Sequence, residues 1–153
     1  MNISLDQASS ATGICFWRDG KPVSPLVTVW KPRKVESFED GCSRMVSGII
    51  VNINDRTNEY DEPVDCIVME DFVKFQAKAR VQALRKLFTF SGYLRRALEE
   101  FYPSARIIGI CKGNAPKTDA KWLAKAHSLT GSEHALDALH LGLLAGFDRK
   151  GPQ

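Results

Sequence analysis

The spacing of apolar and polar residues predicts three strands at the start of the chain. Apolar and polar residues alternate over 2–8, and two further apolar runs follow at 12–17 and 23–30. The turn sequence D-G-K-P at 19–22 is typical of a tight hairpin. We therefore expect an antiparallel arrangement of these strands.

The rest of the chain alternates between helical and strand patterns. Apolar residues recur three and four positions apart in four segments, which predict helices at 36–56, 76–101, 116–129 and 132–147. The short apolar run at 66–70 predicts a strand buried on both faces, and 105–111 predicts a fifth strand. The order βββαβαβαα indicates an α/β fold with a five-stranded mixed sheet, in which three antiparallel strands are followed by parallel ones, flanked by helices.

Composition narrows the class of protein. The chain has 153 residues, 44% hydrophobic and 25% charged, which suits one compact domain over 1–153, and it contains no repeat or long linker. A formal net charge of +3 is too mild to indicate a nucleic-acid partner by itself.

The four cysteines and the N-terminal residues indicate the cellular compartment in which the protein is expected. The cysteines are widely separated, without the spacing of a structural zinc site, and we expect Cys15, Cys66 and Cys111 to be reduced, buried thiols within strands. The first residues lack a signal-peptide pattern, and no apolar run approaches the ~18 residues of a membrane span. We expect a soluble, cytoplasmic protein without a membrane partner.

Four polar residues occur where a chain normally places apolar ones. Asp6 lies in the first strand, Glu70 ends a buried strand, and His134 and Asp137 lie in the last helix. Taken singly, Asp6 could be a solvent-facing edge residue, Glu70 a charge entering a loop, and His134 a residue near the helix start. Asp137 is too deep in an apolar helix for a cap, so its carboxylate needs a cation.

Together the four residues indicate a metal centre. Carboxylate oxygens with one imidazole suit Mg²⁺ or Mn²⁺, and two such ions ~3.5–4 Å apart can activate water and stabilise the leaving oxygen of a phosphodiester. The reaction indicated is phosphodiester hydrolysis. Whether His134 binds metal or positions the water stays open.

These motifs resemble the RuvC family of Holliday junction resolvases, in the RNase H-like superfamily. The resemblance covers almost the whole chain and rests on I-S-L-D at 3–6 followed by T-G at 12–13, M-E at 69–70, and H-A-L-D-A-L at 134–139. It implies Asp6, Glu70, His134 and Asp137 as metal-binding catalytic residues. It also implies a homodimer that nicks two opposed strands of a four-way DNA junction.

The resemblance and the charge pattern suggest DNA-binding residues. The turn G-N-A-P-K at 113–117 is similar to the family's turn that ends in a DNA-contacting lysine, which implies Lys117 and also Lys112. The family's usual glycine after the first aspartate is absent, and Val73 stands where a junction-wedging aromatic is expected, so Phe72 or Phe75 is the candidate for that role. Basic residues recur on one helix face and after Glu70, although such runs are also typical of solvated faces: Lys117, Lys121 and Lys125, and Lys74, Lys78, Arg80, Arg85 and Lys86.

Two aromatic patterns remain. Trp122 is expected in the core, since it shares helical spacing with Leu129. The helix at 76–101 carries aromatic residues on more than one face, which is expected of a helix that packs on its own sheet and on a symmetry mate, or of a helix buried in a monomer. The resemblance to the RuvC family favours the dimer. Two alternatives to a junction resolvase stay open: an RNase H-like nuclease for another branched or hybrid nucleic acid, and a non-catalytic nucleic-acid-binding module.

Overall fold

Three N-terminal strands form the antiparallel meander that the alternating pattern predicts. The computed structural model describes residues 1–32, 36–72 and 81–149. β1 (Asn2–Gln7), β2 (Ala11–Arg18) and β3 (Lys21–Trp30) pair in sequence order. The hairpin between β2 and β3 has positive φ at Asp19 (51°) and Gly20 (75°), as a two-residue turn requires.

Two later strands extend the sheet on the other side of β1. β4 (Cys66–Glu70) pairs in parallel with β1, and β5 (Arg106–Ile110) pairs in parallel with β4. The sheet order is β3-β2-β1-β4-β5, which confirms the predicted five-stranded mixed sheet. Because β1 lies at the centre, a polar side chain on it is enclosed by neighbours.

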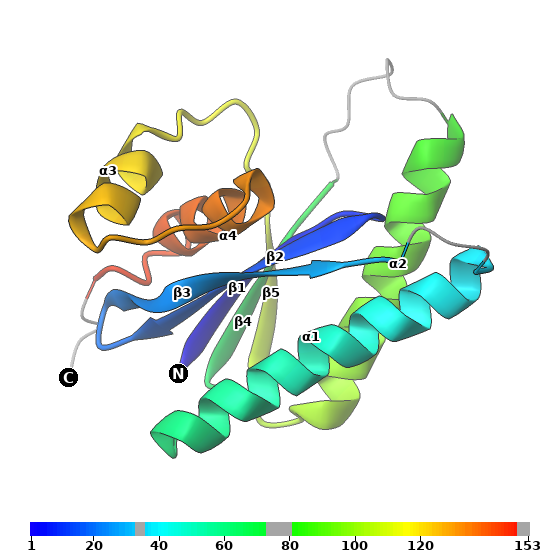
Figure 1. Ribbon diagram of the computed structural model, residues 1–153, viewed down its shortest axis with the longest axis horizontal. Coiled ribbons are helices and arrows are strands. Elements are labelled where there is room, and N and C mark those ends of the chain that lie inside the picture. Colours follow the sequence, from blue (N-terminus) through cyan, green and yellow to red (C-terminus); the bar gives the residue numbers. More distant parts are fainter. Residues whose placement is uncertain (33–35, 73–80, 150–153) are drawn as a thin grey trace.

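Helices cover both faces of the sheet (Figure 1). Two long helices, α1 (Phe38–Tyr60) and α2 (Val81–Phe101), pack on one face, and α4 (Glu133–Leu144), with α3 (Thr118–Ala126) beside it, covers the other. The helix predicted at 76–101 is thus described from Val81 onward. No helix in the described part of the chain is long and apolar enough to cross a membrane.

The alternation along β1 sends its side chains into two different environments. Ile3 and Leu5 belong to the core under α1 and α2. Ser4 accepts a hydrogen bond from the Trp17 indole, and Asp6 points toward α4. Asp6 is only 4% exposed, which rules out a solvent-facing edge position.

The structure corrects two sequence-based expectations. Trp122 is 69% exposed rather than part of the core. The residue of α3 that is buried is Ala120, and two positions further along a helix lie about 200° away around its axis, so Trp122 faces solvent. Cys111 lies just beyond β5 and is exposed, whereas the other three cysteines are buried, and all four are free thiols.

Candidate active site

Asp6 and Glu70 lie next to each other at the ends of two parallel strands. Leu5 of β1 is in register with Met69 of β4, so the next residue of each strand falls at the same edge. Glu70 shares its face of the sheet with Cys66 and Val68, which pack under α4. The sheet therefore presents both carboxylates to α4.

Gln7 fixes the backbone of Glu70. Its side-chain Nε2 donates to the Glu70 carbonyl at 2.8 Å, and its Oε1 accepts from the Glu70 amide at 3.0 Å. The Gln7 side chain thus continues the hydrogen-bonded pairing of β1 and β4 beyond the last paired residues, Leu5 and Met69. Nothing in the sequence pattern indicates this role.

The start of α4 brings two further polar side chains to the same place. Ser132 caps the helix by accepting from the Ala135 amide at 3.3 Å, and its hydroxyl also bonds Thr28 of β3 at 2.6 Å. Gly13 of β2 lies so close to α4 that a Cβ there would be 1.9 Å from the His134 carbonyl oxygen. This close approach places His134 and Asp137 over the ends of β1 and β4.

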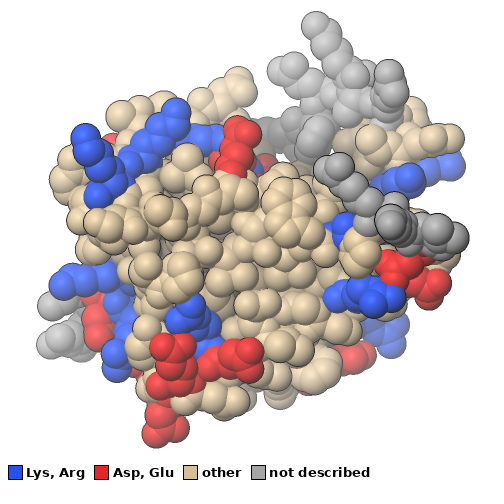
Figure 2. Space-filling view, in the orientation of Figure 1, with Lys and Arg blue, Asp and Glu red and all other residues tan. Residues whose placement is uncertain are grey.

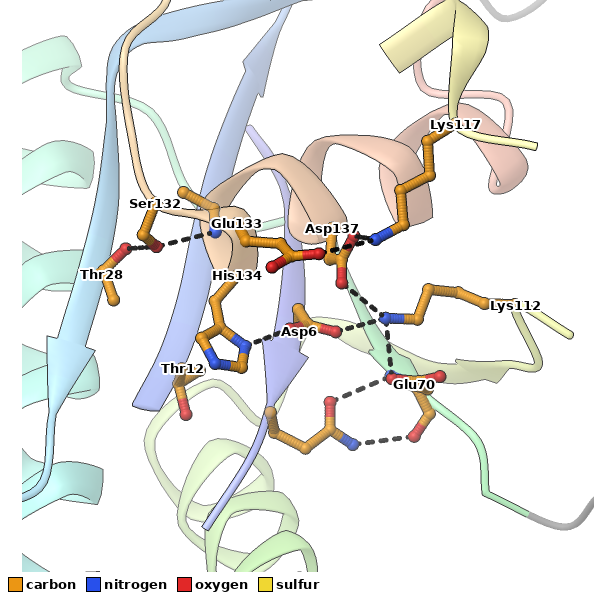
Figure 3. A network of polar contacts seen from close by, with 12 residues as sticks. Asp6, Thr12, Thr28, Glu70, Lys112, Lys117, Ser132, Glu133, His134 and Asp137 are labelled. Atoms are coloured by element: carbon orange, nitrogen blue, oxygen red, sulfur yellow. Dashed lines mark hydrogen bonds and ion pairs between the residues drawn. The ribbon is translucent and has the colours of Figure 1, made fainter. Parts of the chain in front are cut away.

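Two lysines from the loop between β5 and α3 complete an ion-pair cluster (Figure 3). Lys112 Nζ lies 2.5 Å from Asp6 Oδ1, 3.0 Å from Glu70 Oε2 and 3.5 Å from Asp137 Oδ2. Lys117 pairs with the other Asp137 oxygen and lies 3.8 Å from Glu133. All three carboxylates predicted from the sequence therefore converge on one cationic atom.

His134 contacts the cluster through Asp6. Its Nδ1 is 2.8 Å from Asp6 Oδ2, and its side chain is 33% exposed. The half-exposed Trp30, at the end of β3, packs edge-to-face on the imidazole with ring centroids 6.3 Å apart. Trp30 is a second neighbour of the site that the sequence did not reveal.

Burial shapes the ionisation of the cluster. Burial raises the pKa of Glu70, an effect that Lys112 opposes and Asp6 reinforces. For Lys112, burial by itself lowers the pKa, but the contacts with Asp6 and Glu70 outweigh it and the net pKa is raised. Lys112 is therefore an ammonium ion at neutral pH.

The remaining predicted DNA-binding residues fall in different places. Lys121 is exposed on α3. Phe72 is 9% exposed and contacts Phe88 edge-to-face, with centroids 6.2 Å apart. Four of the predicted residues lie outside the described residues: Lys74, Phe75, Lys78 and Arg80.

The donor atoms suit a hard divalent cation, although they now surround an ammonium. Within the ranges that the structure describes, no three Asp, Glu, His or Cys side chains are arranged to hold a metal ion. The carboxylates of Asp6, Glu70 and Asp137 nevertheless approach a single point of positive charge, and a carboxylate set with a neighbouring imidazole is the kind that Mg²⁺ or Mn²⁺ binds. The chemistry of the site thus fits such an ion.

Comparisons with known proteins support the fold. No protein-family model matches the sequence, and no curated protein matches it. Two solved structures are similar: Thermus thermophilus RuvC in complex with a Holliday junction substrate (TM-score 0.65, 14% identity, covering 95% of this chain and 92% of that chain), and a Thermus thermophilus RuvC structure (TM-score 0.60, 14% identity, covering 95% and 93%). The chain has the RNase H-like fold of these RuvC structures.

Proposed function

We propose that this chain is a divalent-metal-dependent endonuclease that cuts four-way DNA junctions. The observation that carries the proposal is the convergence of the Asp6, Glu70 and Asp137 carboxylates at one edge of an RNase H-like sheet. The similar RuvC structure was solved with a Holliday junction substrate, which favours branched DNA over other nucleic acids. At 14% identity, this likeness supports the fold and leaves the substrate to experiment.

The acidic residues would hold the ion, and the basic ones would hold the DNA. Asp6, Glu70 and Asp137, with His134, would bind Mg²⁺ or Mn²⁺, which supplies charge stabilisation at the phosphate and a more acidic bound water. The Asp6 contact at Nδ1 orients the His134 ring and leaves its Nε2 for the ion or the water. Gln7 keeps Glu70 in place during the reaction.

A basic surface beside the site suits a phosphate backbone. Lysine and arginine side chains gather over α3, at the upper left of Figure 2. Lys121 and Lys125 are exposed there, and Lys117 links this helix to Asp137. The exposed Trp122 lies among these lysines, where it could stack on a base.

Cleavage of a synthetic four-way junction tests the proposal. With Mg²⁺ or Mn²⁺, the protein should cut the junction into nicked duplexes and leave linear duplex and RNA/DNA hybrid largely intact. Asp6→Asn should lower the cleavage rate by a factor on the order of 10²–10³ or more, because it removes a charge that holds the ion, while junction binding persists.

The matched control is Asp55→Asn, the same change at an exposed residue of α1 on the opposite face of the sheet. The Asp55→Asn variant should cleave the junction at the same rate as the unchanged protein. Equal cutting of RNA/DNA hybrid would favour an RNase H-like nuclease that acts on other nucleic acids, and normal cutting by Asp6→Asn would contradict the assignment of the site.

A further inference from the structure

The Lys112 ammonium occupies the centre of the acidic cluster. Figure 3 shows its side chain reaching between Asp6, Glu70 and Asp137, and the distances from Nζ are 2.5, 3.0 and 3.5 Å. The side chain is 14% exposed. An ammonium is seldom buried to this extent unless several acids offset the loss of its hydration.

A divalent ion needs the same oxygen atoms. Mg²⁺ takes oxygen ligands at about 2.0–2.1 Å, so an ion shared by these carboxylates would stand where the ammonium now stands. Both Asp6 oxygens already have a partner, since Oδ2 contacts His134 and Oδ1 contacts Lys112. Two positive charges cannot occupy one point in a weakly screened interior without a large repulsion.

We infer that Lys112 is an internal competitor of the catalytic ion: it fills the cation position of the metal-free protein and is displaced when a divalent ion binds. This inference rests on the proposed metal-dependent function. The displaced ammonium would then be available to pair with a DNA phosphate. Metal binding and phosphate binding would therefore favour each other, because the ion releases Lys112 for the phosphate and the phosphate draws Lys112 away from the carboxylates that bind the ion.

The chain around Lys112 permits the exchange. Lys112 lies beyond the end of β5, outside regular structure, and its own four-carbon side chain can swing without movement of the sheet. The next residue, Gly113, has φ of 54° and open space around its α-carbon, so the adjoining turn is not wedged against a neighbour among the described residues.

The test is the affinity of the protein for Mn²⁺ in the absence of DNA, measured by isothermal titration calorimetry. Lys112→Met keeps the length of the side chain but removes its charge. We expect it to bind Mn²⁺ at least about tenfold more tightly than the unchanged protein, because the ion no longer displaces an ammonium. Lys21→Met, the same change at an exposed lysine at the start of β3, should leave the affinity within about twofold.

Thermal unfolding gives a second readout that does not depend on nuclease activity. Without metal, Lys112→Met should melt at a lower temperature, since its three carboxylates have lost their shared counterion, and Mn²⁺ should raise its melting temperature more than that of the unchanged protein. If this variant does not fold without metal, Lys112→Gln provides the same charge change with a polar group.

The outcomes separate this inference from the proposed function. If the variant binds Mn²⁺ no more tightly than the unchanged protein, or if neither binds it, the competition is refuted. If the tenfold difference appears but junctions are not cut, the competition stands and the proposed substrate is wrong.

Discussion

His140 lies one turn beyond Asp137 and is buried without a partner for one of its ring nitrogens. The residue is 4% exposed, and its Nε2 makes no hydrogen bond within the described part of the chain. Burial lowers the pKa of His140, and the nearby Lys112 lowers it further, although Asp137 acts in the opposite direction. The folded protein therefore favours neutral His140.

This imidazole should make the protein sensitive to acid. The pKa of His140 in the folded state is below the value of ~6.5 expected for an unfolded chain, so the unfolded state binds more protons as the pH falls. The stabilising contribution is present above pH ~6.5 and is lost as the pH falls through the lowered pKa. His140→Met should raise the free energy of unfolding at pH 7 by about 1 kcal/mol, because it removes an unpaired polar atom.

Urea unfolding at pH 7 and pH 5 measures both effects. The loss of stability between these pH values should be smaller in His140→Met than in the unchanged protein. His127→Gln is the control, because His127 is an exposed histidine at the end of α3. An equal loss in His140→Met would show that His140 does not carry the acid sensitivity.

Whether the role of a single residue can be predicted from the sequence depends on what that residue contacts. Asp137 could be recognised because a charge within an apolar helix needs a partner wherever the helix packs. The roles of Gln7 and Trp30 could not be recognised in this way. Gln7 bonds the backbone of a residue 63 positions away, and Trp30 packs on the ring of His134. The central position of Lys112 likewise follows from contacts across 106 residues of chain.

At the scale of elements, the position of α4 depends on the glycine it contacts on β2. A methyl group at Gly13 would overlap the His134 carbonyl, so Gly13→Ala must push the start of α4 away from the sheet. We expect a loss of stability of about 1–3 kcal/mol from this overpacking. Because α4 carries His134 and Asp137, the proposed nuclease activity should also fall.

Chemical denaturation of Gly13→Ala and Gly92→Ala makes a matched comparison. Gly92 lies within α2, and no described residue packs within 4 Å of the position that an alanine methyl group would take there. Gly92→Ala should therefore stabilise the protein by about 0.5–1 kcal/mol. If both variants gain stability, the close approach of β2 and α4 does not constrain the site.

The elements themselves were largely predictable, but the exposure of their faces was not. β4 begins and ends at the predicted residues, because four apolar residues and the final Glu70 stand between two polar segments. The spacing in α3 correctly predicted a helix, yet it assigned Trp122 to the core. Periodicity identifies the apolar side of a helix, whereas the covered side depends on neighbours, and α3 buries only the small Ala120 among its residues.

At the scale of the whole molecule, the two faces of the sheet differ in what they leave exposed. The ion-pair cluster lies on the side of α4, whereas α2, on the other side, exposes several large apolar side chains. These are Val81, Phe88, Tyr93 and Phe101, each more than half exposed. We propose that the chain forms a homodimer to which α2 contributes, because a two-fold dimer would present two sites to a two-fold junction.

Sedimentation at the protein concentration used for cleavage tests the dimer. Phe88→Asp should shift the protein to a monomer, because it replaces one of the large apolar side chains that α2 exposes with a charge, whereas Val51→Asp, a similar change at an exposed position of α1, should leave the dimer intact. The monomer should keep its affinity for Mn²⁺, since each site is built within one chain. Its junction products should then be single nicks instead of paired ones, and paired nicks from a monomer would contradict the need for two subunits.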